Sequence, residues 1–74
     1  MPMETNEYYK ILAQNIRIER ARNKISQLKL SELANLSLDT ISTIEREVAN
    51  PTLSTIIAIA NALKVDLNTL LPLK

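Results

Sequence analysis

The chain has 74 residues, 46% of them hydrophobic, with two aromatic residues, no cysteine, histidine or glycine, and a formal net charge of +1. This length allows one small domain, spanning residues 1–74, whose core must be built from Leu, Ile, Val and Ala. The lack of cysteine and histidine excludes a disulfide and the usual zinc ligands, so we expect no metal and no cofactor.

The first predicted helix begins after Thr5 or Asn6, either of which can cap it, and runs to about Asn23. Residues 1–6 before it are expected to be flexible. The residues expected to face inward from this helix are Leu12, Ala13 and Ile16.

A second helix is predicted from the cap Ser26 through Asn35, after a short connection at residues 24–25. Leu30 and Ala34 lie four residues apart and form its buried stripe. A turn follows at residues 35–37. Asn35 in this turn tolerates a left-handed backbone better than other residues with a side chain do.

Ser37 is the expected cap of a third helix, in which Ile41 and Ile44 face the core. The side chains expected to face outward are Leu38, Asp39, Ser42 and Thr43. No glycine follows this helix, so a slightly longer third helix is an open expectation.

Pro51, preceded by Asn50, stops the helical pattern, and Thr52 can cap a fourth helix. The core residues predicted for this helix are Leu53, Ile56, Ala60 and Leu63. Asp66 is the expected cap of a last short helix that ends at Pro72. The last helix carries Leu67, Leu70 and Leu71.

Positive charge is concentrated in one stretch of the chain. Residues 10–29 contain six cationic residues and one glutamate, a net +5, whereas residues 1–9 carry −2, residues 30–50 carry −3 and residues 51–74 carry +1. Charges on an exposed helix are usually only a solvated face, so this stretch alone is a weak indication of phosphate contact.

A longer pattern of residues strengthens that indication. Its members are Ser26-Gln27, Leu30, Ala34, Ser37, residues 40–42, residues 44–46, Asn50-Pro51 and Leu53, flanked by Ile16-Arg17, Arg20, Ile59-Ala60, Leu63, Val65 and Leu70. Over about residues 11–71 the sequence therefore resembles the phage repressor/Cro class of helix-turn-helix domains, also called the xenobiotic-response-element class. The resemblance implies a compact, five-helix, all-α, lambda-repressor-like domain with the motif at about residues 26–46. The class usually has glycine at the position of Asn35, so the resemblance also implies a left-handed backbone there. It often has glycine after the third helix, where this chain has Glu47.

The resemblance also implies where DNA would bind. The third helix would enter the major groove, where Leu38 can meet a thymine methyl and Asp39 can accept a hydrogen bond from cytosine N4. For Gln27, contact with phosphate or a base is favoured over simple capping. The full set of expected DNA contacts is Arg17, Lys24, Gln27, Ser37, Leu38, Asp39, Ser42, Thr43, Arg46 and Asn50.

Arg20 and Glu45 have a different expected role. In the resembled class the matching residues form a structural ion pair between the first helix and the end of the third. We therefore expect this pair to hold the fold together rather than to contact DNA.

A domain this small buries little surface on DNA, so a homodimer on an inverted repeat is expected. The candidate dimer surface comprises Ile57 and Ala58 of the fourth helix, with Leu67, Leu71 and Leu73 added from the tail. Leu28 and Leu33 are also expected to be exposed.

The resulting hypothesis is a transcriptional regulator that binds double-stranded DNA, with repression by promoter occupancy as the expected mechanism. The alternative is a protein-binding adaptor or antitoxin-like module of the same fold, whose exposed Leu28, Leu33 and Leu38 dock a protein partner. An enzyme is not expected, because the chain lacks His, Cys and a glycine-rich phosphate loop.

No apolar run approaches the roughly 18 residues of a membrane span; the longest candidate is Ile56 to Ala60. Residues 1–7 contain glutamate rather than a basic region, and they lack the apolar core of a signal peptide. We therefore expect a cytoplasmic protein with no membrane partner.

Overall fold

The structure is a computed structural model that describes residues 4–72. It consists of α-helices and their connections, without a strand in the described part, and it confirms the predicted all-α, five-helix fold. The helices are α1 (Thr5–Asn23), α2 (Gln27–Ala34), α3 (Leu38–Glu45), α4 (Leu53–Leu63) and α5 (Leu67–Leu70).

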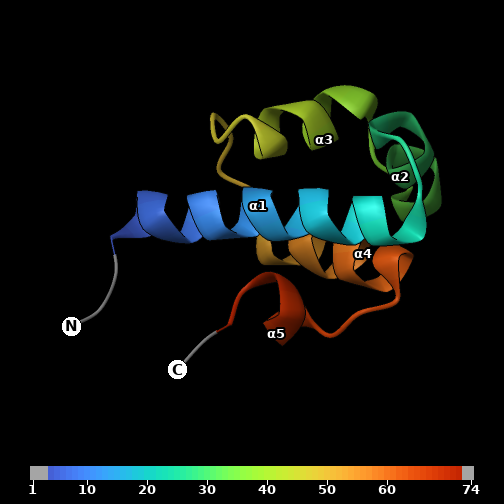
Figure 1. Ribbon diagram of the computed structural model, residues 1–74. Helices are drawn as coiled ribbons and strands as arrows, with labels where there is room; N and C mark the ends of the chain where they lie inside the picture. The colour runs from blue at the N-terminus through green and yellow to red at the C-terminus, as the bar shows by residue number, and fades with distance from the viewer. Residues whose placement is uncertain (1–3, 73–74) are drawn as a thin grey trace.

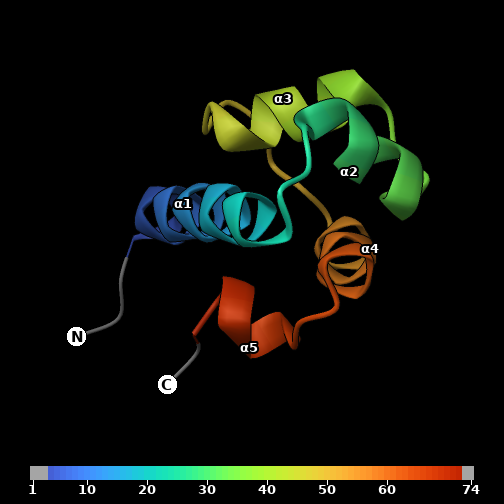
Figure 2. The same cartoon turned by 45° about the vertical axis from the view of Figure 1, so that its right-hand side comes forward.

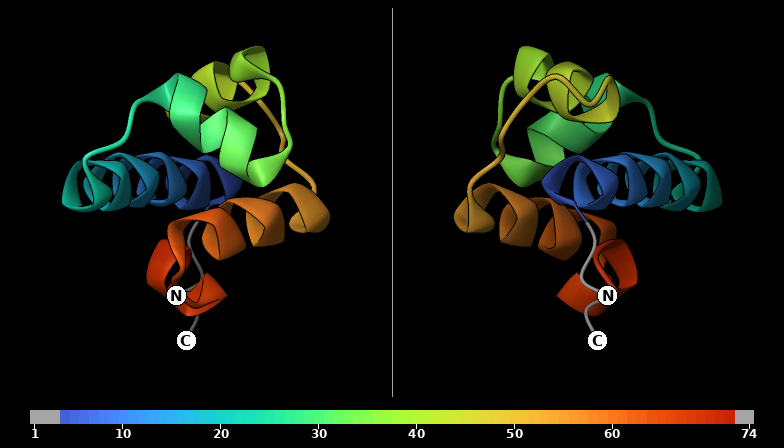
Figure 3. Two further views of the ribbon diagram at one scale, coloured as in Figure 1. Left: turned by 90° about the vertical axis from the view of Figure 1, so that its right-hand side faces the viewer. Right: turned by 90° about the vertical axis from the view of Figure 1, so that its left-hand side faces the viewer.

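The other four helices are arranged around the long helix α1. In Figure 1, α2 and α3 lie above α1, whereas α4 and α5 lie below it. Figure 2 looks nearly along α4 and shows the helices arranged around a common interior, with α5 on the side away from α2 and α3. Each of α3, α4 and α5 packs against α1, and α2 packs against both α3 and α4. The side views in Figure 3 show that α2 and α3 together occupy one end of the molecule.

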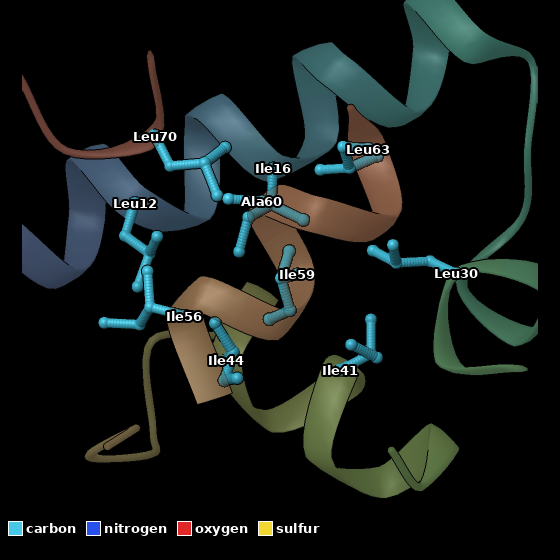
Figure 4. Close-up of a cluster of buried hydrophobic side chains, with 10 residues drawn as sticks. All are labelled: Leu12, Ile16, Leu30, Ile41, Ile44, Ile56, Ile59, Ala60, Leu63 and Leu70. Carbon is cyan, nitrogen blue, oxygen red and sulfur yellow. The ribbon is translucent and has the colours of Figure 1, made fainter. Parts of the chain in front are cut away.

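The interior is a single aliphatic cluster to which every helix contributes (Figure 4). Its buried members are Leu12, Ile16, Leu30, Ile41, Ile44, Ile56, Ile59, Ala60, Leu63 and Leu70. Ala13, predicted as a third inward residue of α1, is also fully buried. Because burial of each Leu or Ile contributes about 1.5–3 kcal/mol, this cluster is the main source of stability.

The prediction that Leu53 belongs to the core is wrong, because its side chain is 61% exposed. The buried side of α4 runs through Ile56, Ile59 and Leu63, and Leu53 lies at the margin of that side in the first turn of the helix. Ile59, which was not predicted as a core residue, is fully buried instead. Ala34 of α2 is only half-buried.

Three of the predicted helix caps are confirmed. The side-chain oxygens of Ser26, Ser37 and Thr52 accept hydrogen bonds from backbone N–H groups three residues later, at 3.0, 3.0 and 3.2 Å. These bonds satisfy donors that the first turn of each helix leaves free, so they fix where α2, α3 and α4 begin.

Two other caps differ from the prediction. The residue that precedes α1 is Glu4, whose backbone N–H donates to the Glu7 carboxylate at 3.3 Å, so Thr5 and Asn6 lie inside the first helical turn. Residues 1–3 of the segment predicted to be flexible lie outside the described residues. Asp66 precedes α5 as expected, but its side chain makes no capping hydrogen bond.

The turns are built without glycine. Asn35 has the left-handed backbone that was predicted, with φ of 57°, and Lys24, Glu47 and Lys64 share it, with φ of 56°, 65° and 61°. The left-handed turn at Glu47 explains why α3 is not lengthened and ends at Glu45. A left-handed conformation costs a residue with a Cβ atom about 1–2 kcal/mol, so these turns hold a measurable amount of strain.

The short helix α5 is joined to α1 by a side chain. Asn15 donates from Nδ2 to the carbonyl oxygen of Leu70 at 2.9 Å, and Leu70 itself is fully buried. Within residues 4–72, no helix combines the length and the apolar character that crossing a membrane would require.

Candidate nucleic-acid interface

The helices α2 and α3 meet through a turn that is closed by backbone hydrogen bonds. The N–H groups of Asn35 and Leu36 donate to the carbonyl oxygens of Glu32 and Ser31, at 3.2 and 2.9 Å. The hydroxyl of Ser31 is buried and donates to the Leu28 carbonyl at 2.6 Å. The relative placement of α2 and α3 is therefore fixed by local bonds as well as by the core.

On the inner side of α3, Glu45 forms the predicted ion pair with Arg20. Its carboxylate accepts from Nε and Nη2 of Arg20 at 2.7 and 2.9 Å, a two-point contact in which the Glu45 side chain is only 3% exposed. Arg20 also donates from Nη1 to the Ile25 carbonyl at 3.1 Å. The pair thus connects α1, the connection before α2, and the end of α3.

The hydrogen bond to Glu45 raises the pKa of the Arg20 guanidinium above its ordinary value, although burial acts in the opposite direction. A group whose pKa is raised on folding stabilises the protein below its unfolded pKa and loses that effect only as pH rises through the folded pKa. Arg20 therefore contributes the same stabilisation throughout the neutral and moderately alkaline range.

Two residues expected at the DNA surface also bind Glu45. Gln27 donates from Nε2 to Glu45 Oε1 at 3.1 Å, and Arg17 donates from Nη1 to the Glu45 carbonyl oxygen. We call these four residues, Arg17, Arg20, Gln27 and Glu45, the Glu45 clamp. The bonds of Arg17 and Gln27 were not predicted, because 28 and 18 residues separate the partners and no local spacing links them.

The outer side of α3 carries the residues that were predicted to face away from the core. We call Leu38, Asp39, Ser42 and Thr43 the outward face of α3. Leu38 is 44% exposed and Asp39 is exposed, whereas Ser42 and Thr43 are half-buried.

The hydroxyl groups along α3 are mostly engaged within the helix. Thr43 Oγ1 donates to the Asp39 carbonyl at 2.8 Å and lies 3.1 Å from the Thr40 carbonyl. The hydroxyls of Ser37 and Thr40 bond to each other at 2.7 Å. Asp39 is different, because no residue among 4–72 forms a hydrogen bond or ion pair with its carboxylate.

The cationic stretch is partly used inside the protein. Arg22 pairs with the buried Glu19 at 2.8 Å. The lysines of this stretch, Lys10, Lys24 and Lys29, are exposed and have no side-chain partner among the described residues. Of the remaining residues expected to contact DNA, Arg46 and Asn50 are exposed. Lys24 precedes α2, Lys29 lies in the first turn of α2 and Arg46 follows α3. These side chains can neutralise phosphates without breaking an ion pair of residues 4–72.

Within residues 4–72, no three acidic, histidine or cysteine side chains gather in a way that could hold a metal ion.

Comparison with known proteins gives matches over most of the chain. Residues 16–70 match a family model described as helix-turn-helix. A control protein, C.SmaI of Serratia marcescens, is 43% identical over 61 residues, which are 82% of this chain and 73% of that protein. An immunity repressor protein of Bacillus phage phi105 is 39% identical over 59 residues, which are 80% of this chain but only 41% of the repressor.

Two solved structures have the same fold. A hypothetical transcription factor, NHTF from Neisseria, superposes with a TM-score of 0.85 at 32% identity, covering 96% of this chain and 85% of that chain. The restriction-modification controller protein C.AhdI from Aeromonas hydrophila superposes with a TM-score of 0.80 at 27% identity, covering 84% of this chain and 94% of that chain.

Proposed function

Because this chain belongs to the helix-turn-helix family, we propose that it is a sequence-specific DNA-binding transcriptional regulator that represses by occupying an inverted-repeat operator as a homodimer. The observation that carries the proposal is the pairing of α2 and α3, in which the Glu45 clamp fixes the inner side of α3 while Leu38 and Asp39 of its outward face are exposed. The similarity to a phage immunity repressor and to two controller proteins supports a regulatory role.

In the proposed complex, α3 lies in the major groove and its outward face meets base edges. Leu38 contacts a thymine methyl, Ser42 bonds to a base edge or phosphate, and Thr43 accepts a hydrogen bond from a base edge. Ser37 and Asn50 contact the backbone at the two ends of this region.

Cationic residues hold the phosphate backbone on either side. Lys24 and Arg46 supply free positive charge, and Arg17 does so from the edge of the Glu45 clamp. Gln27 stands at the beginning of α2, where backbone N–H groups favour a phosphate oxygen. Because its Nε2 group has two hydrogens and gives one to Glu45, the second remains for DNA.

The proposed dimer uses the side of the molecule formed by α4 and α5. Ile57 is 41% exposed on α4, while Leu67 and Leu71 are half-buried and pack partly against their own core. Leu73, which was also expected at this surface, lies outside the described residues. An Ile57→Glu variant tests the surface best, because it removes an exposed apolar side chain without opening the core.

The test is a selection from random-sequence duplexes at two salt concentrations, followed by sequencing of the bound fraction. We expect an inverted repeat whose half-sites lie about 34 Å apart, one helical turn of DNA. Ile57→Glu should sediment as a monomer and lose the paired half-sites. Weak binding that enriches no sequence and disappears with added salt would contradict the proposal.

A second candidate function, the protein-binding module, is favoured by one observation. Leu28 and Leu33 are each about half exposed, and with Leu38 they give the α2–α3 region three exposed leucines. A toxin-like or adaptor partner would cover these side chains. Binding of such a partner without sequence-specific DNA binding would select this alternative.

Two further expectations belong to the proposal. The relatives that match are regulatory proteins by name, so we propose that this chain acts without catalysis. As a regulator of transcription it would act in the cytoplasm, where bacterial DNA is accessible.

A further inference from the structure

The hydrogen-bonding groups on the outward face of α3 are mainly acceptors. Thr43 donates its only hydroxyl proton to carbonyl oxygens inside the helix, so its oxygen can only accept from outside. The Asp39 carboxylate is also an acceptor. Leu38 is apolar, and Ser42 is the one member of this face whose hydroxyl can also donate.

The Asp39 carboxylate is exposed and has no partner of its own among residues 4–72. If α3 enters a DNA groove, this charge loses water and meets a surface dominated by acceptors and phosphates. An unpaired desolvated carboxylate is costly, so Asp39 must find a donor there.

Only two groups in the major groove donate hydrogen bonds, the amino groups at cytosine N4 and adenine N6. Their neighbours on the same base differ. Adenine N6 lies beside the acceptor N7, which repels the second carboxylate oxygen, whereas cytosine N4 lies beside C5–H, which does not. A carboxylate at this position therefore discriminates cytosine from adenine as well as from guanine and thymine.

We propose that Asp39 determines specificity by requiring a cytosine at one position of each half-site, where its carboxylate accepts a hydrogen bond from N4. This inference rests on the proposed function, because it assumes that α3 binds in the major groove. It implies that Asp39 weakens non-specific binding through phosphate repulsion and strengthens discrimination at one base pair.

The test begins with the same selection from random duplexes, made with wild type, Asp39→Ala and Asp39→Asn. We expect wild type to enrich cytosine at one position of each half-site, and Asp39→Ala to lose the preference at that position alone. Asp39→Asn should shift the preference to adenine, because an amide can donate to N7 while it accepts from N6.

A matched control removes the same charge elsewhere. Glu32 is an exposed carboxylate on α2 and is not part of the outward face of α3. Glu32→Ala should raise affinity for all duplexes alike and leave the enriched sequence unchanged, whereas Asp39→Ala should raise affinity for random duplexes only.

Modified bases give the most direct measurement. The selected cytosine is replaced by 5-methylcytosine opposite guanine, or by thymine opposite adenine, so that both bases carry a C5 methyl but only the first has an N4 amino group. We expect wild type to bind the 5-methylcytosine duplex about tenfold more tightly, and Asp39→Ala to bind the two duplexes within about twofold of each other.

The outcomes distinguish a failure of the proposed function from a failure of the role proposed for Asp39. If wild type enriches no sequence, the proposed function fails. If wild type enriches a motif that Asp39→Ala enriches equally, or binds both modified duplexes equally, the function stands and the role of Asp39 is overturned.

Discussion

The inner and outer sides of α3 differ in how their charged groups are satisfied. On the inner side, Glu45 is buried and receives hydrogen bonds from three side chains, those of Arg17, Arg20 and Gln27. On the outer side, Asp39 is exposed and has no partner among the described residues. The same helix thus carries one carboxylate that fixes its position, Glu45, and one without a partner among the described residues, Asp39. Removal of the first should lower the unfolding free energy far more than removal of the second.

The largest expected effect is on the inner side. Glu45→Ala leaves the Arg20 guanidinium and the Gln27 amide without their acceptor in a partly buried site, so we expect unfolding free energy to fall by about 3 kcal/mol. Urea denaturation followed by far-UV circular dichroism measures the change.

Glu32→Ala is the control for that measurement, because it removes an exposed carboxylate that no clamp residue contacts. The unfolding free energy of Glu32→Ala should differ from that of the wild type by no more than about 0.5 kcal/mol. If Glu45→Ala is too unstable to measure, Arg20→Lys takes its place, because it keeps the charge but loses the two-point contact. Its loss of unfolding free energy should lie between those of Glu45→Ala and Glu32→Ala. Equal effects of Glu45→Ala and Glu32→Ala would show that the clamp contributes no more than a surface residue.

Gln27→Ala is expected to have the next largest effect. Its amide donates to a buried charged group, a kind of hydrogen bond that contributes about 1.5–3 kcal/mol, and the lower value applies because Gln27 is only half-buried. The same substitution in a Glu45→Gln background should cost less, because the acceptor is then neutral. A double-mutant cycle of urea denaturation gives this coupling, and a coupling of zero would mean that the two side chains do not interact in solution.

The sequence predicts the helices and their caps better than it predicts the side-chain contacts between helices. The caps Ser26, Ser37 and Thr52 follow from local chemistry, because each hydroxyl bonds within one helical turn. The Arg20–Glu45 pair was expected only through the family resemblance, since 25 residues separate its members.

Other features could not be obtained from local spacing. The bonds of Arg17 and Gln27 to Glu45 depend on how three helices pack, which no periodicity describes. Leu53 fits the apolar spacing of α4, but tertiary packing decides which part of the stripe is covered, and it leaves Leu53 exposed. The contacts that the outward face makes with DNA stay a prediction.

A substitution at Glu47, in the turn that follows α3, should change the unfolding free energy by a smaller amount. Glu47 has a left-handed backbone with φ of 65°, which a glycine would adopt without steric cost. Glu47→Gly should raise unfolding free energy by about 0.5–1 kcal/mol, since the larger flexibility of glycine in the unfolded chain offsets part of the gain. Thermal denaturation measures it against Glu47→Gln, which removes the same charge but keeps the Cβ atom; equal stability of the two variants would argue against a left-handed Glu47.

The smallest expected effect on stability is that of Asp39→Ala, on the outer side of α3. Asp39 lies in the first turn of the helix, where a negative charge interacts favourably with free N–H groups, so its loss should cost about 0.5 kcal/mol. This loss is far below that expected for Glu45→Ala, although both substitutions remove a carboxylate from the same eight-residue helix. Urea denaturation of the two variants in parallel measures the difference. A loss of 2 kcal/mol or more for Asp39→Ala would mean that the outer carboxylate also supports the fold, and a change in DNA binding could then no longer be assigned to base contact alone.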